Sequence, residues 1–374
     1  MSLKAFPVPG SGSSFRCEFC RRVTRIKPQH GEREGALTLA PRSPPCLMVP
    51  ASYPRLCGKK RALLMGVNYT GRSHQLEGCL NDVRAMRHLL CHKFGFPSDA
   101  ILELTAGARC ETEKEEPWMA PTRENLLRAM RWLVDGTSCG DSLVFHFSGH
   151  GTQKPDLNGD EVDGYNEALC PLDVEESGKI LDDEINETIV RPLGPGVKLH
   201  AIADTCHSGT MLDLPYLCRQ SRYRNLKHTK SYFSDRSKHM SRQTALRLIS
   251  SVMGYWQWEN HCNAGMAPKR PSGGLAISIS SCRDDQKCDE TTGEWGSMGI
   301  MTASFIKAVE DDPGTTYGRL LRSMRARISD EQGNRRLRGR LGSFVRRMIM
   351  PGSVQEPQLC SSEAFDIYQK PFLL

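Results

Sequence analysis

The chain has 374 residues, of which 39% are hydrophobic and 25% are charged. This composition is typical of globular proteins, and it excludes a collagen, a coiled coil and a wholly disordered chain. No stretch approaches the length of apolar sequence that a membrane span needs, and the first residues hold no apolar core of a secretory signal. The formal net charge of +7 is too small to indicate nucleic-acid binding. We therefore expect an intracellular protein with neither a membrane nor a nucleic-acid partner.

The cysteine content favours free thiols over a disulfide framework. The chain holds 15 cysteines, an odd number, in a long sequence without a visible signal peptide. Such cysteines are typical of a reducing compartment, where single ones act as metal ligands or reactive thiols.

Residues 1–58 are rich in Pro, Gly, Ser and Arg and show no sustained periodicity, so we predict a flexible N-terminal arm. Cys17 and Cys20 form a CxxC pair, which is half of a zinc site. Cys46 and Cys57 are too irregularly spaced to complete it clearly. The arm is therefore interpreted either as a partial zinc finger or as a segment with exposed thiols.

From residue 59 the sequence alternates between short apolar runs and amphipathic stretches. The expected strands are 61–67, 100–104, 142–147, 197–203, 275–281 and an edge strand at 365–368. The expected helices are 78–93, 122–134 with Thr122 as N-cap, 183–190, 300–310 and 315–329. This alternation predicts an α/β fold with a mainly parallel central sheet and helices on both faces.

One basic stretch interrupts the pattern. Residues 219–247 contain nine Lys or Arg and a single acid, Asp235, which predicts a solvated linker. We expect a catalytic region at 59–217, a basic linker at 218–272 and a second structural region at 273–374.

Two segments at the ends of expected strands carry residues suited to catalysis. One contains His150 and Gly151, and the other contains Cys206 and His207. The carboxyl ends of parallel strands face the same crevice, so a thiolate nucleophile at Cys206 and a proton-transferring His150 can meet. The N–H groups of Gly151 and Cys206 are candidate oxyanion donors. His207 is a competing base, but adjacent residues leave a strand in opposite directions, which favours His150.

These segments, together with 60–69, 76–83, 180–184 and 211–215, resemble the metacaspases, the caspase-like cysteine proteases of plants, fungi and protozoa. The similarity runs from about residue 60 to 217 and resumes more loosely from 274 to 368. The Cys-containing arm is similar to the type I plant form. The resemblance implies a caspase-like three-layer sandwich and a cysteine endopeptidase.

The resemblance also implies cleavage after Arg or Lys. The matching positions of the basic-residue pocket are Cys79, Asp82, Ser148 and Asp204. Carboxylates in such a pocket pair with a substrate guanidinium. Asp82 has a second interpretation, as an acid at a helix N-terminus that the helix dipole stabilises.

Calcium activation is a further implication of the resemblance. The matching ligands are Asp173, Asp182, Asp183 and Asp213, and clustered carboxylates suit a calcium ion. The alternative is four unrelated surface acids.

A protease that cuts after basic residues and carries a basic linker is expected to cut itself within 219–247. The rival hypothesis is a catalytically weak caspase-like adaptor in cell-death or stress signalling. Residues 287–290 depart from the family pattern, which leaves subsite preference open. We expect a monomer in the cytoplasm, with the basic runs at 219–247 and 335–347 leaving nuclear entry open.

Overall fold

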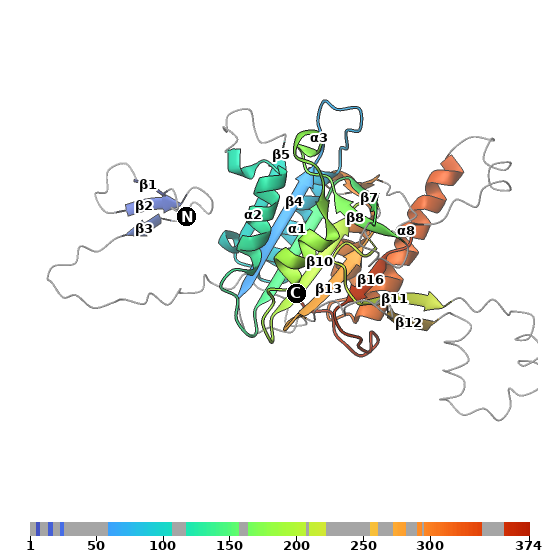
Figure 1. Ribbon diagram of the computed structural model, residues 1–374. Helices are drawn as coiled ribbons and strands as arrows, with labels where there is room; N and C mark the ends of the chain where they lie inside the picture. Colours follow the sequence, from blue (N-terminus) through green and yellow to red (C-terminus); the bar gives the residue numbers. More distant parts are fainter. Residues whose placement is uncertain are drawn as a thin grey trace, which may run out of the picture. The chain divides into compact units, whose positions relative to one another are not determined.

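The computed structural model describes residues 5–7, 14–17, 23–25, 59–106, 117–156, 164–206, 209–221, 255–260, 272–281, 290–293, 295–338 and 355–374 (Figure 1). The chain divides into two compact units, Met1–Pro44 and Pro45–Leu374. In the first unit, β1 (Ala5–Pro7), β2 (Ser14–Cys17) and β3 (Val23–Arg25) form an antiparallel sheet. The flexible arm expected from the sequence did not include these three strands. Strands of three or four residues are too short for periodicity to reveal them.

The second unit is built on an eight-stranded sheet with the order β12-β11-β16-β13-β10-β6-β4-β5. Five strands are parallel: β4 (Lys60–Val67), β5 (Ile101–Ala106), β6 (Ser142–Ser148), β10 (Lys198–Asp204) and β13 (Leu275–Ser280). The antiparallel side adds β16 (Gln358–Ser361), β11 (Tyr216–Ser221) and β12 (Tyr255–Asn260). The predicted mainly parallel sheet is confirmed.

Helices pack on both faces of this sheet (Figure 1). One face is covered by α1 (Cys79–His92), α7 (Ile300–Asp311) and α8 (Tyr317–Arg338). The other is covered by α2 (Arg123–Val134), α4 (Asp182–Ile185) and the π-helical turn η3 (Asn186–Val190). This arrangement confirms the three-layer architecture, with two hydrophobic cores.

The two cores follow from alternation along the buried strands. In β6, Leu143, Phe145 and Phe147 pack on the α2 face, whereas Val144 packs on the α1 face. Successive side chains of a strand point to opposite faces, so His146 and Ser148 share the face of Val144. At the start of α2, the expected N-cap is confirmed because the Thr122 side chain accepts a hydrogen bond from the Asn125 N–H.

Smaller elements surround the carboxyl edge of the sheet. β7 (Gly151–Pro155), β8 (Tyr165–Leu169) and β9 (Ile180–Leu181) form an antiparallel sheet, and α3 (Val174–Ser177) lies between β8 and β9 in the sequence. β14 (Glu290–Gly293) and β15 (Gly296–Gly299) form a hairpin that leads directly into α7. Short 3-10 turns occur at η1 (Ser98–Ala100) and η2 (Pro117–Met119).

Two sequence expectations are corrected here. The expected edge strand at 365–368 is a turn region, and the strand of this part of the chain is β16. The expected linker at 218–272 contains most of β11 and all of β12, which pair over their full length from Tyr216↔Asn260 to Ser221↔Tyr255. β12 lies after the basic run 219–247 and contains no Lys or Arg, and its Trp256 and Trp258 pack against the α8 face of the core. Residues 222–254 lie outside the described part of the chain.

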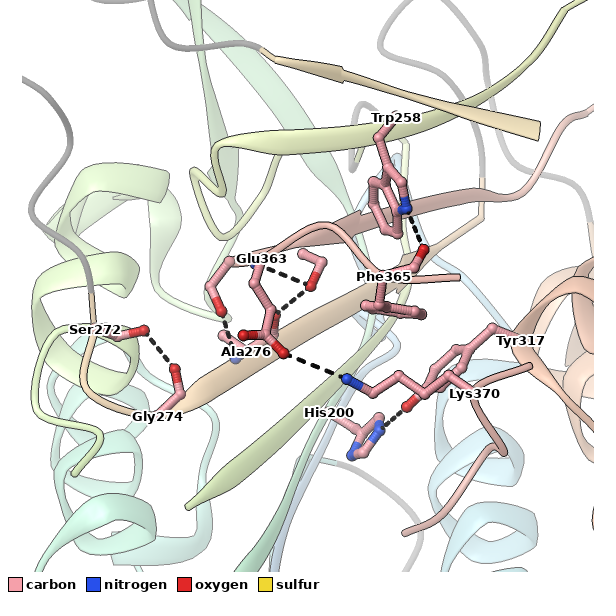
Figure 2. Close-up of polar contacts among 11 residues, drawn as sticks. His200, Trp258, Ser272, Gly274, Ala276, Tyr317, Glu363, Phe365 and Lys370 are labelled. Atoms are coloured by element: carbon pink, nitrogen blue, oxygen red, sulfur yellow. Dashed lines mark hydrogen bonds and ion pairs between the residues drawn. The ribbon is translucent and has the colours of Figure 1, made fainter. Parts of the chain in front are cut away.

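Hydrogen bonds and aromatic contacts attach the C-terminal segment to the sheet (Figure 2). Trp258 Nε1 of β12 donates to the Phe365 carbonyl at 2.6 Å, and Lys370 pairs with Glu363 at 3.4 Å. Below them, the buried His200 Nε2 and Tyr317 hydroxyl lie 2.6 Å apart.

No helix among the residues that the structure describes is long and apolar enough to cross a bilayer.

Two fully buried imidazoles make the stability of the fold depend on pH. Burial lowers the pKa of both His146 and His200 from the ordinary 6.5 to about 3, and the neighbouring Lys198 and Lys370 add to the shift at His200. As the pH falls below 6.5, the unfolded chain takes up protons that the folded chain excludes. The contribution of these two histidines to the free energy of unfolding is therefore complete above pH 6.5 and is lost progressively as the pH falls toward about 3.

We expect the urea midpoint to fall steadily with pH in this window, and His200→Gln to reduce the histidine-dependent slope by about half, because one of two equivalent groups no longer titrates. Denaturation curves at several pH values measure this. The exposed His92→Gln variant is the control and should keep the wild-type slope. An unchanged slope in His200→Gln would contradict the assignment.

Candidate functional site

The ends of β6 and β10 bring the two candidate catalytic segments together. The strands pair in parallel, with Ser148 opposite Asp204, and Gly149 N–H donates to the Asp204 carbonyl at 3.3 Å. Beyond the strands the contact becomes closer still. A Cβ atom on Gly151 would lie 2.2 Å from the Cys206 carbonyl oxygen and 2.4 Å from Thr205 Oγ1. Glycine is therefore required at position 151 because two backbones meet there.

The residue before the candidate nucleophile is anchored from β13. Ser281 Oγ donates to the Thr205 carbonyl at 2.7 Å and accepts from the Thr205 N–H at 3.2 Å. Cys206 itself is partly exposed, whereas five other described cysteines are buried. Burial raises the pKa of several of these thiols, for example to about 12 at Cys218. Among the cysteines that the structure describes, Cys206 is thus the accessible thiol at the carboxyl end of the sheet.

The backbone and ring of His150 are held by different neighbours. Its N–H donates to the Tyr69 hydroxyl at 3.0 Å, and its carbonyl accepts from the Cys170 N–H at 3.0 Å. Its Nε2 lies 2.6 Å from the His74 carbonyl oxygen. A carbonyl oxygen only accepts, so this contact favours the tautomer with the proton on Nε2 and leaves Nδ1 as the basic nitrogen.

A second group of polar residues lies on the α1 face of the same strand ends. Asp82 of α1 is fully buried, and its carboxylate accepts from Ser148 Oγ at 2.6 Å and from the Gly299 N–H at 3.0 Å. Asp204 Oδ2 accepts from the Thr302 N–H at 2.8 Å. Three of the expected pocket residues, Asp82, Ser148 and Asp204, are therefore gathered around the start of α7.

Gly299 lies at the centre of this group. A Cβ atom there would be 2.1 Å from Asp204 Oδ2 and 2.9 Å from Asp82 Oδ2. The N-terminus of α7 supplies N–H donors to both carboxylates, and the positive end of the helix dipole favours negative charge at this position. Asp82 is thus not simply an acid at the start of its own helix, since its carboxylate accepts from both Ser148 of β6 and Gly299 at the start of α7.

Cys79, the fourth expected pocket residue, is the first residue of α1, and its N–H donates to Asn68 Oδ1 at 3.1 Å. Cys79 and Asp82 are three residues apart and so share one helix face. The side chain of Cys79 is buried.

The four expected calcium ligands are distributed over several turns. Asp182 accepts from the N–H groups of Glu167 and Asp183, and Asp173 accepts from the Arg123 N–H at 2.8 Å. Asn186, one turn after Asp182, donates to the carbonyls of Leu212 and Asp213 at 2.7 and 3.2 Å. The helix that carries Asp182 and Asp183 therefore packs beside Asp213. Asp173 instead lies at the start of α2, where it accepts from the Arg123 N–H.

These aspartates do not fit calcium as a preformed set. In the described ranges, no three His, Cys, Asp or Glu side chains converge as metal ligands would. The expected zinc pair is only half described, because Cys17 ends β2 and Cys20 lies outside the described residues. It stays a prediction.

The structure adds four residues that the sequence did not single out: Tyr69, His74, Gly299 and Thr302. Tyr69 and His74 follow the end of β4, and the rule that strand ends face the crevice offers a signal for them. Gly299 and Thr302 act through backbone N–H groups, which any residue type carries, so no sequence pattern points to them.

Comparison with known proteins identifies the family of this chain. The family model "Metacaspase, peptidase C14 domain" matches residues 60–215. Metacaspase-1 from Arabidopsis thaliana is 42% identical over 98% of this chain and 93% of its own. Metacaspase-3 from the same plant is 44% identical over 85% of this chain and 76% of its own. Among solved structures, protein GSU0716 from Geobacter sulfurreducens aligns with 84% of this chain and 99% of its own, with 20% identity and a TM-score of 0.49. The chain therefore belongs to the metacaspases and is a caspase-like cysteine-type endopeptidase.

Proposed function

We propose that this metacaspase cleaves peptide bonds after Arg or Lys with a Cys206–His150 dyad. The observation that carries the proposal is the presence of two buried carboxylates, Asp82 and Asp204, immediately beside the strand ends that bear the dyad. The same small region thus supplies a nucleophile, a base and negative charge.

In the proposed reaction, the Cys206 thiolate attacks the scissile carbonyl and forms a thioester. The N–H groups of Gly151 and Cys206 are the proposed oxyanion donors. His150 takes the thiol proton at Nδ1 and delivers it to the leaving amine, while the His74 carbonyl stabilises the charged imidazolium at Nε2. Water then hydrolyses the thioester with His150 as base.

The basic-residue preference follows from charge. Two buried carboxylates that lie close together repel each other, and the groups seen to donate to them, Ser148 Oγ and the α7 N–H groups, carry no formal charge. A substrate guanidinium or ammonium group adds the missing positive charge. An acidic side chain in the same position meets repulsion, so cleavage after Asp is disfavoured.

Self-processing within 219–247 is a further part of the proposal. The segment offers nine Lys or Arg positions in the chain's own sequence. The monomeric state and the cytoplasmic location stay predictions.

We expect the purified protein to hydrolyse fluorogenic Arg peptides but not Asp peptides. Cys206→Ala and His150→Ala should each lower the rate by about a thousandfold or more, because the nucleophile or its base is lost. Peptide mapping should show self-cleavage at 219–247 in the wild type and an intact chain in both variants. Cys139→Ala, which removes an exposed thiol far from β10 in sequence, is the matched control. Wild-type turnover in Cys206→Ala would end the dyad proposal.

A methyl group at Gly299 should block the proposed pocket. Gly299→Ala places a Cβ 2.1 Å from Asp204 Oδ2, so we expect kcat/KM for an Arg peptide to fall by about a hundredfold. Alkylation of Cys206 by a small uncharged reagent should stay near the wild-type rate, because the nucleophile is not displaced. Gly194→Ala is the control, since a Cβ there meets nothing within 4 Å. Full activity in Gly299→Ala would contradict the pocket assignment.

Calcium activation is proposed from the family resemblance. Because the four aspartates are not assembled as a ligand set, no step of the reaction is assigned to the ion. Binding to the folded chain alone would stabilise it by mass action. We expect calcium to raise the melting temperature of the Cys206→Ala protein, which excludes self-cleavage as a cause, and Asp182→Asn with Asp183→Asn to abolish the shift. Asp366→Asn, in the C-terminal turn, should retain it. If calcium raised the melting temperature of all three proteins equally, Asp182 and Asp183 would not be calcium ligands.

A further inference from the structure

We infer that Tyr69 is a positioning residue for His150, and that its phenol hydroxyl is needed for proton transfer. The inference rests on the proposed role of His150 and extends it to a residue that the sequence did not single out. It follows from the contacts around the loop that leaves β4.

Tyr69 is buried in an unusual backbone conformation. Its φ is +50°, in the left-handed region that side chains other than glycine rarely occupy, and it is 1% exposed. Such a conformation persists only where the surroundings hold it. Here the Tyr69 carbonyl accepts from the Arg72 N–H at 3.1 Å, which starts the turn that leads to His74.

The hydroxyl of Tyr69 closes a ring of hydrogen bonds around His150. It accepts from the His150 N–H at 3.0 Å and donates to the Cys170 carbonyl at 2.6 Å. The Cys170 N–H in turn donates to the His150 carbonyl at 3.0 Å. One hydroxyl therefore acts as both donor and acceptor, which is the full use of a neutral phenol. Burial raises the pKa of Tyr69 far above its ordinary value, so the phenol keeps its proton.

Ring contacts also hold the imidazole of His150. The Tyr69 and His150 ring centroids are 4.7 Å apart, and the His74 ring lies 5.2 Å from Tyr69 and 5.4 Å from His150. The His74 carbonyl holds Nε2 of His150 at 2.6 Å. Tyr69 thus fixes both the backbone of His150 and the start of the turn that supplies its ring acceptor.

Glycine at position 149 makes room for this arrangement. A Cβ atom there would lie 3.2 Å from the Tyr69 hydroxyl and 2.9 Å from Phe147 Cζ. The Ser148-Gly149-His150-Gly151 sequence therefore has two close approaches, one to the phenol and one to the Cys206 backbone.

The test is Tyr69→Phe, which keeps the ring and removes the hydroxyl. We expect kcat for an Arg peptide to fall by about tenfold with KM nearly unchanged, because small displacements of a catalytic group affect the chemical step. The pH dependence of Cys206 alkylation should also shift, since the thiolate is stabilised by a correctly placed imidazolium.

Tyr317→Phe is the matched control. Tyr317 is also a buried tyrosine with a hydrogen-bonded histidine, but its partner His200 lies near the opposite end of β10. The Tyr317→Phe variant should lose stability as Tyr69→Phe does, while it keeps the wild-type kcat and the wild-type pH dependence of Cys206 alkylation. Assays are run well below the unfolding midpoints of both variants. If Tyr69→Phe does not fold, 3-fluorotyrosine at position 69 retains the hydroxyl with altered hydrogen-bond strength, and an intermediate shift of the alkylation profile is expected.

Measuring His150→Ala in parallel distinguishes failure of the Cys206–His150 dyad from failure of the positioning role of Tyr69. If His150→Ala is inactive and Tyr69→Phe behaves like Tyr317→Phe, the positioning role is wrong and the dyad stands. If His150→Ala remains active, the dyad and the positioning role both fall. An unshifted profile in the fluorotyrosine protein also overturns the positioning role.

Discussion

The parallel pairing of β6 and β10 is the constraint on which the rest of the site depends. It places the residues after Ser148 and Asp204 at one edge of the sheet, so that His150 and Cys206, more than fifty residues apart in sequence, leave neighbouring strands. The absence of a side chain at Gly151 then allows the two backbones to touch. The hydrophobic strands contribute to catalysis only through this placement, because their side chains serve the two cores. A change of register by one residue would exchange the two faces and separate Asp204 from α7.

The negative charge of the site is stabilised by backbone groups from a distant part of the chain. Asp82 and Asp204 belong to the first large region, yet their N–H donors come from Gly299 and Thr302 at the start of α7. These bonds join the region at 59–217 to that at 273–374, in addition to the pairing of β10 with β13, and separating the two regions would leave two buried carboxylates without these donors. The hairpin β14–β15 ends at Gly299 and so sets where α7 begins.

The sequence predicted the features that depend on local pattern. Apolar runs located the five parallel strands, and spacings of three and four located α1 and α2. Cys206 and His150 were identifiable because glycines flank them at strand ends. The missed features depend on tertiary contacts. β12 is short and follows the basic run 219–247, and its six residues pair along their full length with β11. Gly299 and Thr302 act through their main chain, and Tyr69 acts through a hydroxyl whose two partners are both backbone atoms. The turn at 365–368 has the composition of a strand, but its position is set by contacts such as Trp258 with Phe365.

The pairing of β11 with β12 also decides what a nick between them would do. Six consecutive residue pairs join the two strands, and β11 is itself hydrogen-bonded to β16. A cut anywhere in 222–254 would leave β11 on one side of it and β12 on the other, and both strands belong to the same sheet. The two polypeptides would therefore remain one particle without a covalent link, with the strand ends that bear His150 and Cys206 still supported from both sides.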